Sequence, residues 1–284
     1  MTTGDAPRNA LFTATFRSLS LEADGAIVEV TLKGPGKGNA LGPDVFQELP
    51  TVFQALDQDE TTRVVILRGQ GAHFSYGLDL FAMGGDLGSF VRGGLAQERL
   101  RLLALVERLQ GAIGSVARCR KPVLAAVQGH CIGGALDLIA ACDIRLASAS
   151  AQFSLREVKL GIVADLGSLQ RLPAIIGEGA TRELAFTGRS IHAERALRLG
   201  LVSEVFSSDE ELLAQTRAMA QEIASHSPLV VRGIKEVMND ALLPSVDAGL
   251  RHVALWNSAF LPSEDLQEAF MAFAQKRPPV FQGR

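Results

Sequence analysis

The sequence predicts a mixed α/β fold whose last part is entirely helical. Short runs rich in β-branched residues, bounded by turn-forming residues, recur through the first 206 residues and predict strands between helices. From residue 207 onward this pattern stops, and apolar residues recur with the spacing of amphipathic helices. We therefore divide the chain into an α/β core, residues 1–206, and a helical region, residues 207–284.

The core is expected to contain six strands separated by helices. Apolar, β-branched runs predict strands at 26–32, 63–69, 121–129, 142–148, 152–155 and 201–206. Helical spacing marks residues 43–58 and 96–119, and small apolar residues at 134–141 suit a short buried helix. Pro50 is expected to disturb the first of these helices, because proline removes a backbone donor.

The helical region is expected to hold four successive helices. They are predicted at residues 209–226, 227–240, 244–261 and 263–276. Ser227 before Pro228 and Ser263 before Glu264 are typical helix starts. Such a segment packs either on its own core or on another subunit, and the pattern does not separate the two.

Composition and charge exclude several classes of partner. The chain is 47% hydrophobic and 21% charged, with a net charge of −3, which argues against nucleic acid or an anionic membrane as a partner. No apolar run reaches membrane-spanning length. The three cysteines form no CxxC pair and indicate reduced structural thiols. The first residues do not resemble a signal peptide and the terminal QGR is not a peroxisomal signal, so we expect a cytoplasmic protein.

Motifs for nucleotide cofactors, metals and serine nucleophiles are absent from the sequence. The stretch GPGKGNA (34–40) has neither the GxGxxG spacing nor that of a phosphate loop. There is no GxSxG elbow and no HExxH pair. We therefore expect neither a cofactor nor a metal.

Two glycine turns are candidates for binding a negatively charged oxygen. HFSYGLDL (73–80) follows a predicted strand, and another strand runs into Gly133-Gly134 and then a helix. Backbone N–H groups at a helix start are unpaired, and glycine lets a ligand approach them closely. Two such donors from separate loops form an oxyanion hole, which stabilises the enolate of a thioester.

Three carboxylates near these turns are candidates for proton transfer. Asp137 lies in the first turn after Gly134, and Glu157 and Asp165 lie in a largely apolar stretch. Each has a structural alternative: Asp137 could complement a helix dipole, Glu157 could pair with Arg156 or Lys159, and Asp165 could cap a helix. Clustered, buried carboxylates have raised pKa values that suit proton transfer.

Five stretches together resemble the crotonase (enoyl-CoA hydratase/isomerase) family over nearly the whole chain. They are KGNAL (37–41), FSYGLDL, GHCIGGALDLIAACDIRLAS, FSLREVKLGIVADLGSLQRLP and EAFMAFAQKRPPVFQGR. The resemblance implies a spiral of ββα units with a C-terminal helical region that builds homotrimers, often paired into homohexamers. It implies an acyl-CoA thioester substrate and an oxyanion hole formed by the N–H groups of Leu78 and Gly134.

Within the family, the acids resemble those of Δ3,5-Δ2,4-dienoyl-CoA isomerases. Hydratases carry two glutamates, where this chain has Asp137 and Glu157, and a glycine where it has Asp165. The resemblance implies that Glu157 acts at C2 of the substrate and Asp165 at C6, while Asp137 tunes their charge. The expected reaction moves both double bonds of a 3,5-dienoyl-CoA to the 2,4 positions, as in fatty-acid β-oxidation.

The resemblance also implies a set of coenzyme A contacts. Tyr76, the only tyrosine, is a candidate for the acyl pocket or a packed hydrophobe, and His73 and His130 are assigned no catalytic role. Lys276 and Phe273 resemble residues that reach coenzyme A from a neighbouring subunit. The expected contacts are Lys37, Asn39, Ala40, Leu41, Phe273 and Lys276, although both lysines are also compatible with solvated surface charges.

Other functions of the same family stay open at this point. One is an enoyl-CoA hydratase or a Δ3-Δ2-enoyl-CoA isomerase with an additional aspartate. Another is a non-catalytic relative that binds acyl-CoA or RNA. The pI of about 6.0 argues against RNA binding. Asp137 is one methylene shorter than the glutamate of hydratases, which argues against efficient hydration. Hydration requires that both carboxylates reach the same water.

Overall fold

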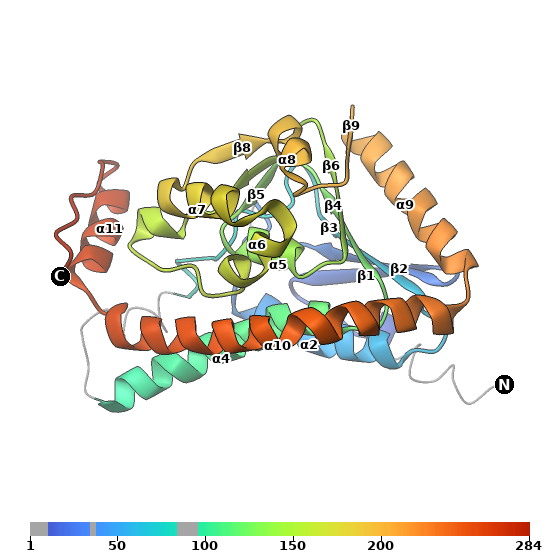
Figure 1. Ribbon diagram of the computed structural model, residues 1–284, viewed down its shortest axis with the longest axis horizontal. Helices are drawn as coiled ribbons and strands as arrows, with labels where there is room; N and C mark the ends of the chain where they lie inside the picture. The colour runs from blue at the N-terminus through green and yellow to red at the C-terminus, as the bar shows by residue number, and fades with distance from the viewer. Residues whose placement is uncertain (1–10, 35–37, 84–95) are drawn as a thin grey trace.

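The computed structural model describes residues 11–34, 38–83 and 96–284, which form two β-sheets surrounded by helices (Figure 1). The first sheet has six strands in the order β1-β2-β3-β4-β6-β9, and the second has three in the order β5-β7-β8. The first contains β1 Leu19–Asp24, β2 Ile27–Leu32, β3 Val64–Gly69, β4 Val123–Val127, β6 Ile144–Ser148 and β9 Glu204–Phe206. The second contains β5 His130–Ile132, β7 Gln152–Ser154 and β8 Ser190–His192.

Strand directions decide where the loops of the large sheet meet. β1 and β2 form an antiparallel hairpin, whereas β2, β3, β4, β6 and β9 are mutually parallel. The carboxyl ends of β3 and β4 therefore lie at the same edge of the sheet. The two glycine turns singled out in the sequence follow these two strands.

Nine helices and one 3-10 turn lie wholly within residues 11–34, 38–83 and 96–284, and helices cover both faces of the large sheet. They are α2 Pro43–Gln58, α4 Ala96–Arg118, α5 Gly134–Ala140, α6 Ser168–Ile176, α7 Glu178–Thr187, α8 Ala193–Leu199, α9 Asp209–Ser225, α10 Pro228–Phe260 and α11 Glu264–Ala274, with the 3-10 turn η1 Glu157–Leu160. α9 packs on one face of the sheet through Leu212 and Ala220. α2, α4 and α5 contribute to the larger core on the other face, and α10 lies along α4. Because helices cover both faces, every residue of β2 is buried.

The predicted α/β fold is confirmed, with differences in particular elements. All six predicted strands are present, while β1, β5 and β8 were not predicted. β5 and β8 have three residues each, too few to display a period of two. None of the helices in the described ranges has the length and apolarity that a membrane crossing requires.

The predicted disturbance at Pro50 and the predicted separation of residues 227–240 and 244–261 into two helices were both wrong. α2 continues through Pro50, and the two helices predicted at 227–240 and 244–261 are a single helix, α10, that continues through Pro244. A proline inside a helix costs roughly 3 kcal/mol. Burial of apolar residues outweighs this cost: Phe46, Leu49 and Phe53 on both sides of Pro50 in α2, and Val246, Leu250 and Val253 after Pro244 in α10.

Candidate active site

The two glycine turns lie side by side at the carboxyl edge of the large sheet. The Ser75 N–H donates to the His130 carbonyl oxygen at 2.9 Å, and the Ile132 N–H donates to the Ser75 carbonyl oxygen at 3.1 Å. Gly77 has a φ of 81°, and a Cβ there would lie 2.2 Å from the Ile132 carbonyl oxygen. Only glycine therefore allows the two turns to approach this closely.

A third segment fixes the direction of the Leu78 N–H. The Leu41 N–H donates to the Gly77 carbonyl oxygen at 2.8 Å, and the Asp79 N–H donates to the Leu41 carbonyl oxygen at 3.0 Å. In this parallel pairing the N–H of Leu78 points away from Leu41. It has no acceptor within residues 11–34, 38–83 and 96–284.

The Gly134 N–H is the second free donor, because Gly134 is the first residue of α5. Gly133 precedes it with a φ of 54° and donates its own N–H to the Ser154 carbonyl oxygen at 2.8 Å. A Cβ on Gly134 would lie 3.7 Å from the Leu78 nitrogen, and one on Gly77 would lie 3.2 Å from the Gly134 nitrogen. The two donors are thus neighbours, as an oxyanion hole requires.

Asp137 is a buried carboxylate that joins α5 to α6. It is 1% exposed, and its Oδ1 accepts a hydrogen bond from the backbone N–H of Ser168, the first residue of α6. Its Oδ2 is buried without a hydrogen-bond partner among the described residues. Asp137 therefore caps a neighbouring helix as well as lying in the first turn of its own.

Glu157 lies at the start of η1, against the glycine pair. A Cβ on Gly133 would lie 3.1 Å from the Glu157 Oε1. The alternative of an ion pair with Arg156 or Lys159 is not observed in the described parts of the chain, and Arg156 donates to the Ser190 hydroxyl instead. The Glu157 Oε2 is buried without a partner within the same ranges. Glu157 is thus the carboxyl in contact with the oxyanion turn.

Asp165 is anchored by two helices. Its Oδ2 accepts a hydrogen bond from Asn257 Nδ2 on α10 at 2.7 Å, and its carbonyl oxygen accepts one from Gln110 Nε2 on α4 at 2.7 Å. The alternative that Asp165 caps α6 is wrong, because the N-cap position is Gly167 and Asp137 receives the first N–H of that helix.

Burial and mutual repulsion raise the pKa values of all three carboxyls. The pKa of Asp165 rises to about 7, mainly through desolvation, opposed by the Asn257 hydrogen bond and assisted by the charge of Asp137. Desolvation also raises the pKa of Glu157, and the charges of Asp137 and Asp165 raise it further. Desolvation raises the pKa of Asp137, while Ser168 and Arg171 lower it. Protons on this cluster therefore exchange near neutral pH.

Exposure divides the three carboxyls into two kinds. Asp137 is buried. Glu157 and Asp165 are half-buried residues. Of the three residues, Glu157 and Asp165 are therefore the two that keep solvent-accessible surface. Asp137 acts on them through its charge.

Tyr76 lies between the oxyanion turns and the early loop. Its ring packs over Gly38, where any Cβ would overlap the ring, and it is 46% exposed. The rings of His73 and His130 each lie 5.0 Å from it, measured between centroids. Whether Tyr76 contacts the acyl group stays a prediction.

The expected coenzyme A contacts are dispersed. Asn39 is buried and donates to the Gln70 and His73 carbonyl oxygens at 2.8 Å, so it holds the loop together. Leu41 is also buried, Ala40 lies between them, and Lys37 lies outside the described residues. Phe273 on α11 is exposed, and its ring centroid lies 6.4 Å from that of Phe81, beyond the first oxyanion turn. Lys276 follows α11 with a φ of 54°.

Four polar residues of the site were not predicted from the sequence: Gln110, Ser168, Arg171 and Asn257. Asn257 continues the buried stripe of α10 formed by Val246, Leu250 and Val253. A polar residue at a position where the helical spacing predicts a buried apolar one would have indicated Asn257. A buried polar group needs a hydrogen-bond partner.

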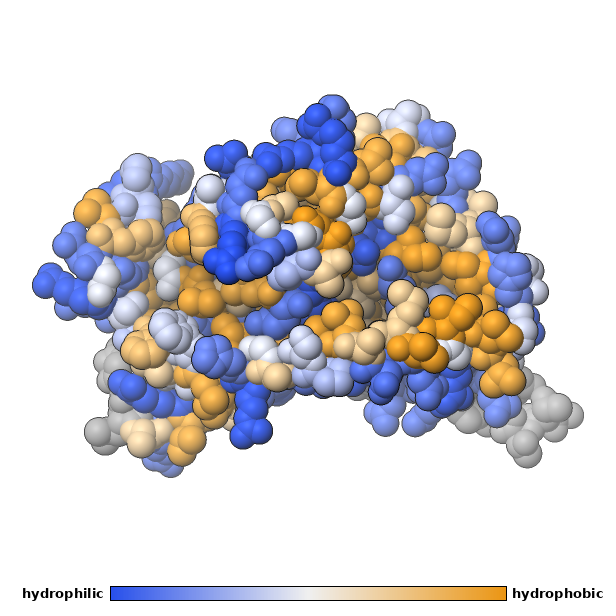
Figure 2. Space-filling model, viewed as in Figure 1, coloured by the Kyte–Doolittle hydropathy of each residue, from blue (hydrophilic) through white to orange (hydrophobic). Residues whose placement is uncertain are grey.

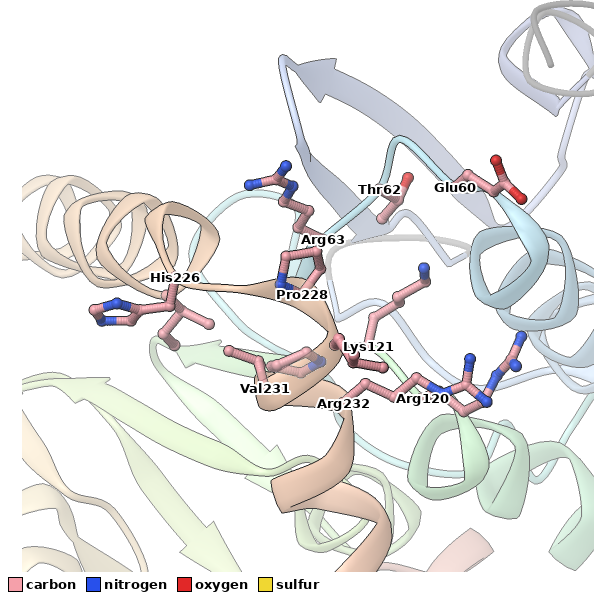
Figure 3. Close-up of a pocket in the computed structure, with 12 residues that line it drawn as sticks. Glu60, Thr62, Arg63, Arg120, Lys121, His226, Pro228, Val231 and Arg232 are labelled. Atoms are coloured by element: carbon pink, nitrogen blue, oxygen red, sulfur yellow. The ribbon is translucent and has the colours of Figure 1, made fainter.

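A separate cavity of about 260 Å³ lies beside the start of α10 (Figure 3). Its lining includes Arg63, Lys121, Arg232 and Arg120, and Arg120 is paired with Asp57 at 2.8 Å. None of the three carboxyls lines this cavity. In the described part of the chain, no group of three or more His, Cys, Asp or Glu side chains is placed to hold a metal ion.

The chain is similar to known proteins over most of its length. Residues 22–284 match the family model described as enoyl-CoA hydratase/isomerase. A peroxisomal Delta(3,5)-Delta(2,4)-dienoyl-CoA isomerase of Arabidopsis thaliana is 43% identical over 94% of this chain and 96% of its own. A mitochondrial one of Dictyostelium discoideum is 40% identical over 94% and 92%. A solved enoyl-CoA hydratase/isomerase from Pseudoalteromonas atlantica T6c, 27% identical, superposes with a TM-score of 0.80 over 94% of this chain and 100% of that one.

Proposed function

The chain belongs to the enoyl-CoA hydratase/isomerase family, and from that premise we propose that it converts a 3,5-dienoyl-CoA to a 2,4-dienoyl-CoA. The observation that carries this proposal is the third carboxyl: Asp165 lies within electrostatic range of Glu157 and Asp137 and accepts a hydrogen bond from Asn257. Relatives at 43% and 40% identity that bear the name of this activity support it.

The proposed reaction begins at the two free backbone donors. The thioester oxygen accepts hydrogen bonds from the Leu78 and Gly134 N–H groups, which stabilise the negative charge that forms on it. One donor of this kind is worth about 3 kcal/mol in the transition state. The C2 proton becomes acidic because the resulting dienolate places its charge on that oxygen.

Two carboxyls then move protons at opposite ends of the diene. Glu157 contacts the glycine pair, so it is the base that removes the proton from C2. The electron pair delocalises through the dienolate, and the protonated carboxyl of Asp165 donates a proton to C6. Before the next turnover Glu157 releases its proton to solvent and Asp165 takes one up from solvent. Desolvation raises the pKa of Asp165 to about 7 and that of Glu157 to about 8, so the reactive arrangement, with Glu157 charged and Asp165 protonated, is a minor fraction of the protein at neutral pH.

Asp137 supplies a negative charge at neutral pH, because its pKa, raised by desolvation to about 6, stays below those of Glu157 and Asp165. Its hydrogen bond from Ser168 and the nearby Arg171 favour its charged form. That charge raises the pKa of both Glu157 and Asp165. Asp137 thereby helps to hold the transferable proton on the two carboxyls that meet the substrate.

Hydration of a 2-enoyl-CoA is the second candidate, favoured by the name of the solved relative. By resemblance, Asp137 and Glu157 occupy the two acid positions of a hydratase. However, Asp137 is enclosed and its Oδ1 is engaged by Ser168, so it is poorly placed to share a water with Glu157. We expect hydration to be weak.

A parallel spectrophotometric assay tests the function. Purified protein is given a 3,5-dienoyl-CoA, followed at the longer-wavelength band of the conjugated 2,4-diene, and separately a 2-enoyl-CoA. Isomerisation that exceeds hydration supports the proposal, and hydration alone contradicts it. Asp165→Asn is expected to lose about 10²- to 10⁴-fold in isomerisation. Glu194→Gln, on the exposed surface of α8, is the matched control.

We further propose that residues 207–284 form the oligomerisation region of a homotrimer or homohexamer. Figure 2 shows hydrophobic side chains gathered along the first half of α10. They include the exposed residues Leu229, Val230, Ile234, Val237 and Met238. An exposed apolar surface of this kind favours contact with another subunit. Light scattering after size-exclusion chromatography tests the subunit number.

Coenzyme A enters this reaction only as part of the substrate, and acid–base chemistry needs no further cofactor. We propose that Lys276 and Phe273 contact coenzyme A in the assembled oligomer. A higher KM with unchanged kcat in Lys276→Ala would support this assignment. Lys121→Ala, in the separate cavity, is its control.

The proposed location is a reducing compartment, with the cytoplasm as our prediction. Free, buried Cys119, Cys131 and Cys142 support reducing conditions. The names of the two relatives place those proteins in peroxisomes and mitochondria. Cell fractionation decides between these compartments.

A further inference from the structure

Asn257 makes the contacts that determine how Asp165 is held. It lies on α10 with 2% exposure, and its Nδ2 donates to Asp165 Oδ2 at 2.7 Å and to the Val163 carbonyl oxygen at 2.9 Å. Both acceptors are oxygens, so the amide orientation is fixed by its partners. Both N–H bonds of the amide are used, which leaves it no alternative pairing at this site.

The backbone beneath Asp165 is held by a second amide. Gln110 on α4 donates from Nε2 to the Asp165 carbonyl oxygen at 2.7 Å and to the Leu250 carbonyl oxygen on α10 at 3.0 Å. Asp165 belongs to a segment between η1 and α6 that has no regular secondary structure. Two packed helices therefore supply the rigidity that the segment itself lacks.

The chemistry of an amide nitrogen decides where the proton of Asp165 lies. The –NH₂ group of Asn257 only donates, so Asp165 Oδ2 accepts from it in both protonation states. The carbonyl oxygen of a carboxylic acid is a stronger acceptor than its hydroxyl oxygen, so this hydrogen bond favours the proton of Asp165 on Oδ1. Oδ1 is the oxygen not engaged by Asn257.

We infer that Asn257 is a positioning residue that makes Oδ1 the proton-donating oxygen of Asp165 and holds it at a fixed angle to the substrate. This inference rests on the proposed function and deepens it. It makes the C-terminal helix α10 part of the active site. It also pairs Asp165 with a specific partner on α10.

The charged groups that face Asp165 come from two other elements. They are Asp137 on α5 and Glu157 on η1, whereas α4 and α10 contribute the neutral amides of Gln110 and Asn257. Asn257 favours the charged form of Asp165 and so lowers its pKa. Removal of this donor raises the pKa, and the alkaline limb of the kcat profile, where the acid loses its proton, moves to higher pH.

Asn257→Leu tests the inference, because leucine has a similar volume and no donor. We expect kcat for the dienoyl-CoA to fall about 10- to 100-fold, with KM changed less than about threefold. In an Asp165→Asn background the same substitution should add little further loss, because the acid that it positions is absent. Asn257→Ala, which also has no side-chain donor, replaces the leucine variant if that variant does not fold.

Asn239→Leu is the matched control. Asn239 lies on the same helix and donates to the Ala117 carbonyl oxygen on α4 at 3.2 Å, away from the three carboxyls. It should lower stability without changing the pH profile. Equal effects of the two leucine substitutions on kcat and on the profile would overturn the inference.

A titration independent of turnover separates this inference from the proposed function. Carbon-13 NMR of labelled aspartates follows the carboxyl of Asp165, assigned through Asp165→Asn, in the wild-type and Asn257→Leu proteins. A higher pKa of Asp165 in the variant supports the positioning role. If the wild-type protein does not isomerise dienes, that result contradicts the proposed function and leaves the positioning role intact. An unchanged pKa, or a variant with wild-type kcat and pH profile, overturns the inference.

Discussion

The Asp137 carboxylate accepts a hydrogen bond from the backbone N–H of Ser168, and this contact joins the helix that starts at the oxyanion turn to the next helix of the site. It places a negative charge inside the core, 1% exposed, within range of two further carboxyls. A buried charge with one engaged oxygen is costly to fold, which indicates that it serves the chemistry.

Asp137→Asn should shift the pH dependence of isomerisation to lower pH. The asparagine oxygen can still accept from Ser168, so the helix junction is kept while the charge is removed. The charge of Asp137 raises the pKa of Glu157 and Asp165, and without it both values fall. Both limbs of the kcat profile should then move to lower pH. A profile that coincides with that of the wild-type protein would refute the assigned role.

Gly77→Ala should damage catalysis by displacing one oxyanion donor. Its Cβ would lie 2.2 Å from the Ile132 carbonyl oxygen and 3.2 Å from the Gly134 nitrogen. We expect kcat to fall about 10²- to 10³-fold, the typical effect of losing one such donor. Gly71→Ala is the matched control, because Gly71 also has a positive φ, 73°, but has no atom within 4 Å of its Cβ position. Similar losses of kcat in the two variants would show that strain, not the donor, is responsible.

Asp165→Asn should stabilise the fold at alkaline pH. Burial raises the pKa of Asp165 from its ordinary value of 3.8 to about 7, so folding favours the protonated form. That stabilisation is fully present below pH 3.8 and is lost as the pH rises through about 7. Asparagine cannot ionise and avoids the loss, while its oxygen still accepts from Asn257.

Calorimetry at pH 5 and pH 8.5 tests this expectation. The variant should gain at least about 2 °C in Tm over the wild-type protein at pH 8.5, the shift that roughly 1 kcal/mol gives in a chain of this size. The gain should be smaller at pH 5. A Tm difference independent of pH would mean that Asp165 does not carry the raised pKa.

The three cysteines should resist thiol reagents in the folded protein. All are buried and free, and desolvation raises the pKa of Cys119 to about 11 and that of Cys142 to about 12. It also raises the pKa of Cys131 well above its ordinary value. Because the thiolate is the reactive form, a colorimetric thiol assay at pH 8 should detect the cysteines only after denaturation. Rapid labelling of the native protein would contradict this.

The elements that carry the oxyanion donors could be predicted from the sequence, because their signals are local. A β-branched run followed by a glycine pair and a short helix fixes backbone geometry within a few residues, and Gly133 and Gly134 adopt the expected junction. The three acids were predicted as a set through the resemblance to the crotonase family. The structure places Glu157 against the first of these glycines.

The partners of the acids could not be predicted, because they depend on tertiary packing. Asn257 is far from Asp165 in the sequence and meets it only because α10 lies along α4. Two helices were predicted at residues 227–240 and 244–261, whereas the structure has one continuous helix that carries Asn257. Local sequence preferences therefore predicted the wrong length for α10, the helix on which Asn257 lies.

The central claim is that one carboxyl removes the proton at C2 and another, Asp165, delivers a proton to C6. Isomerisation of a 3,5-dienoyl-CoA in deuterium oxide, with the product examined by NMR, tests it most directly. The account predicts deuterium at C6 in the product of the wild-type protein, no such product from Asp165→Asn, and loss of exchange at C2 in Glu157→Gln. Product that retains only protium at C6, or a fully active Asp165→Asn variant, would contradict it.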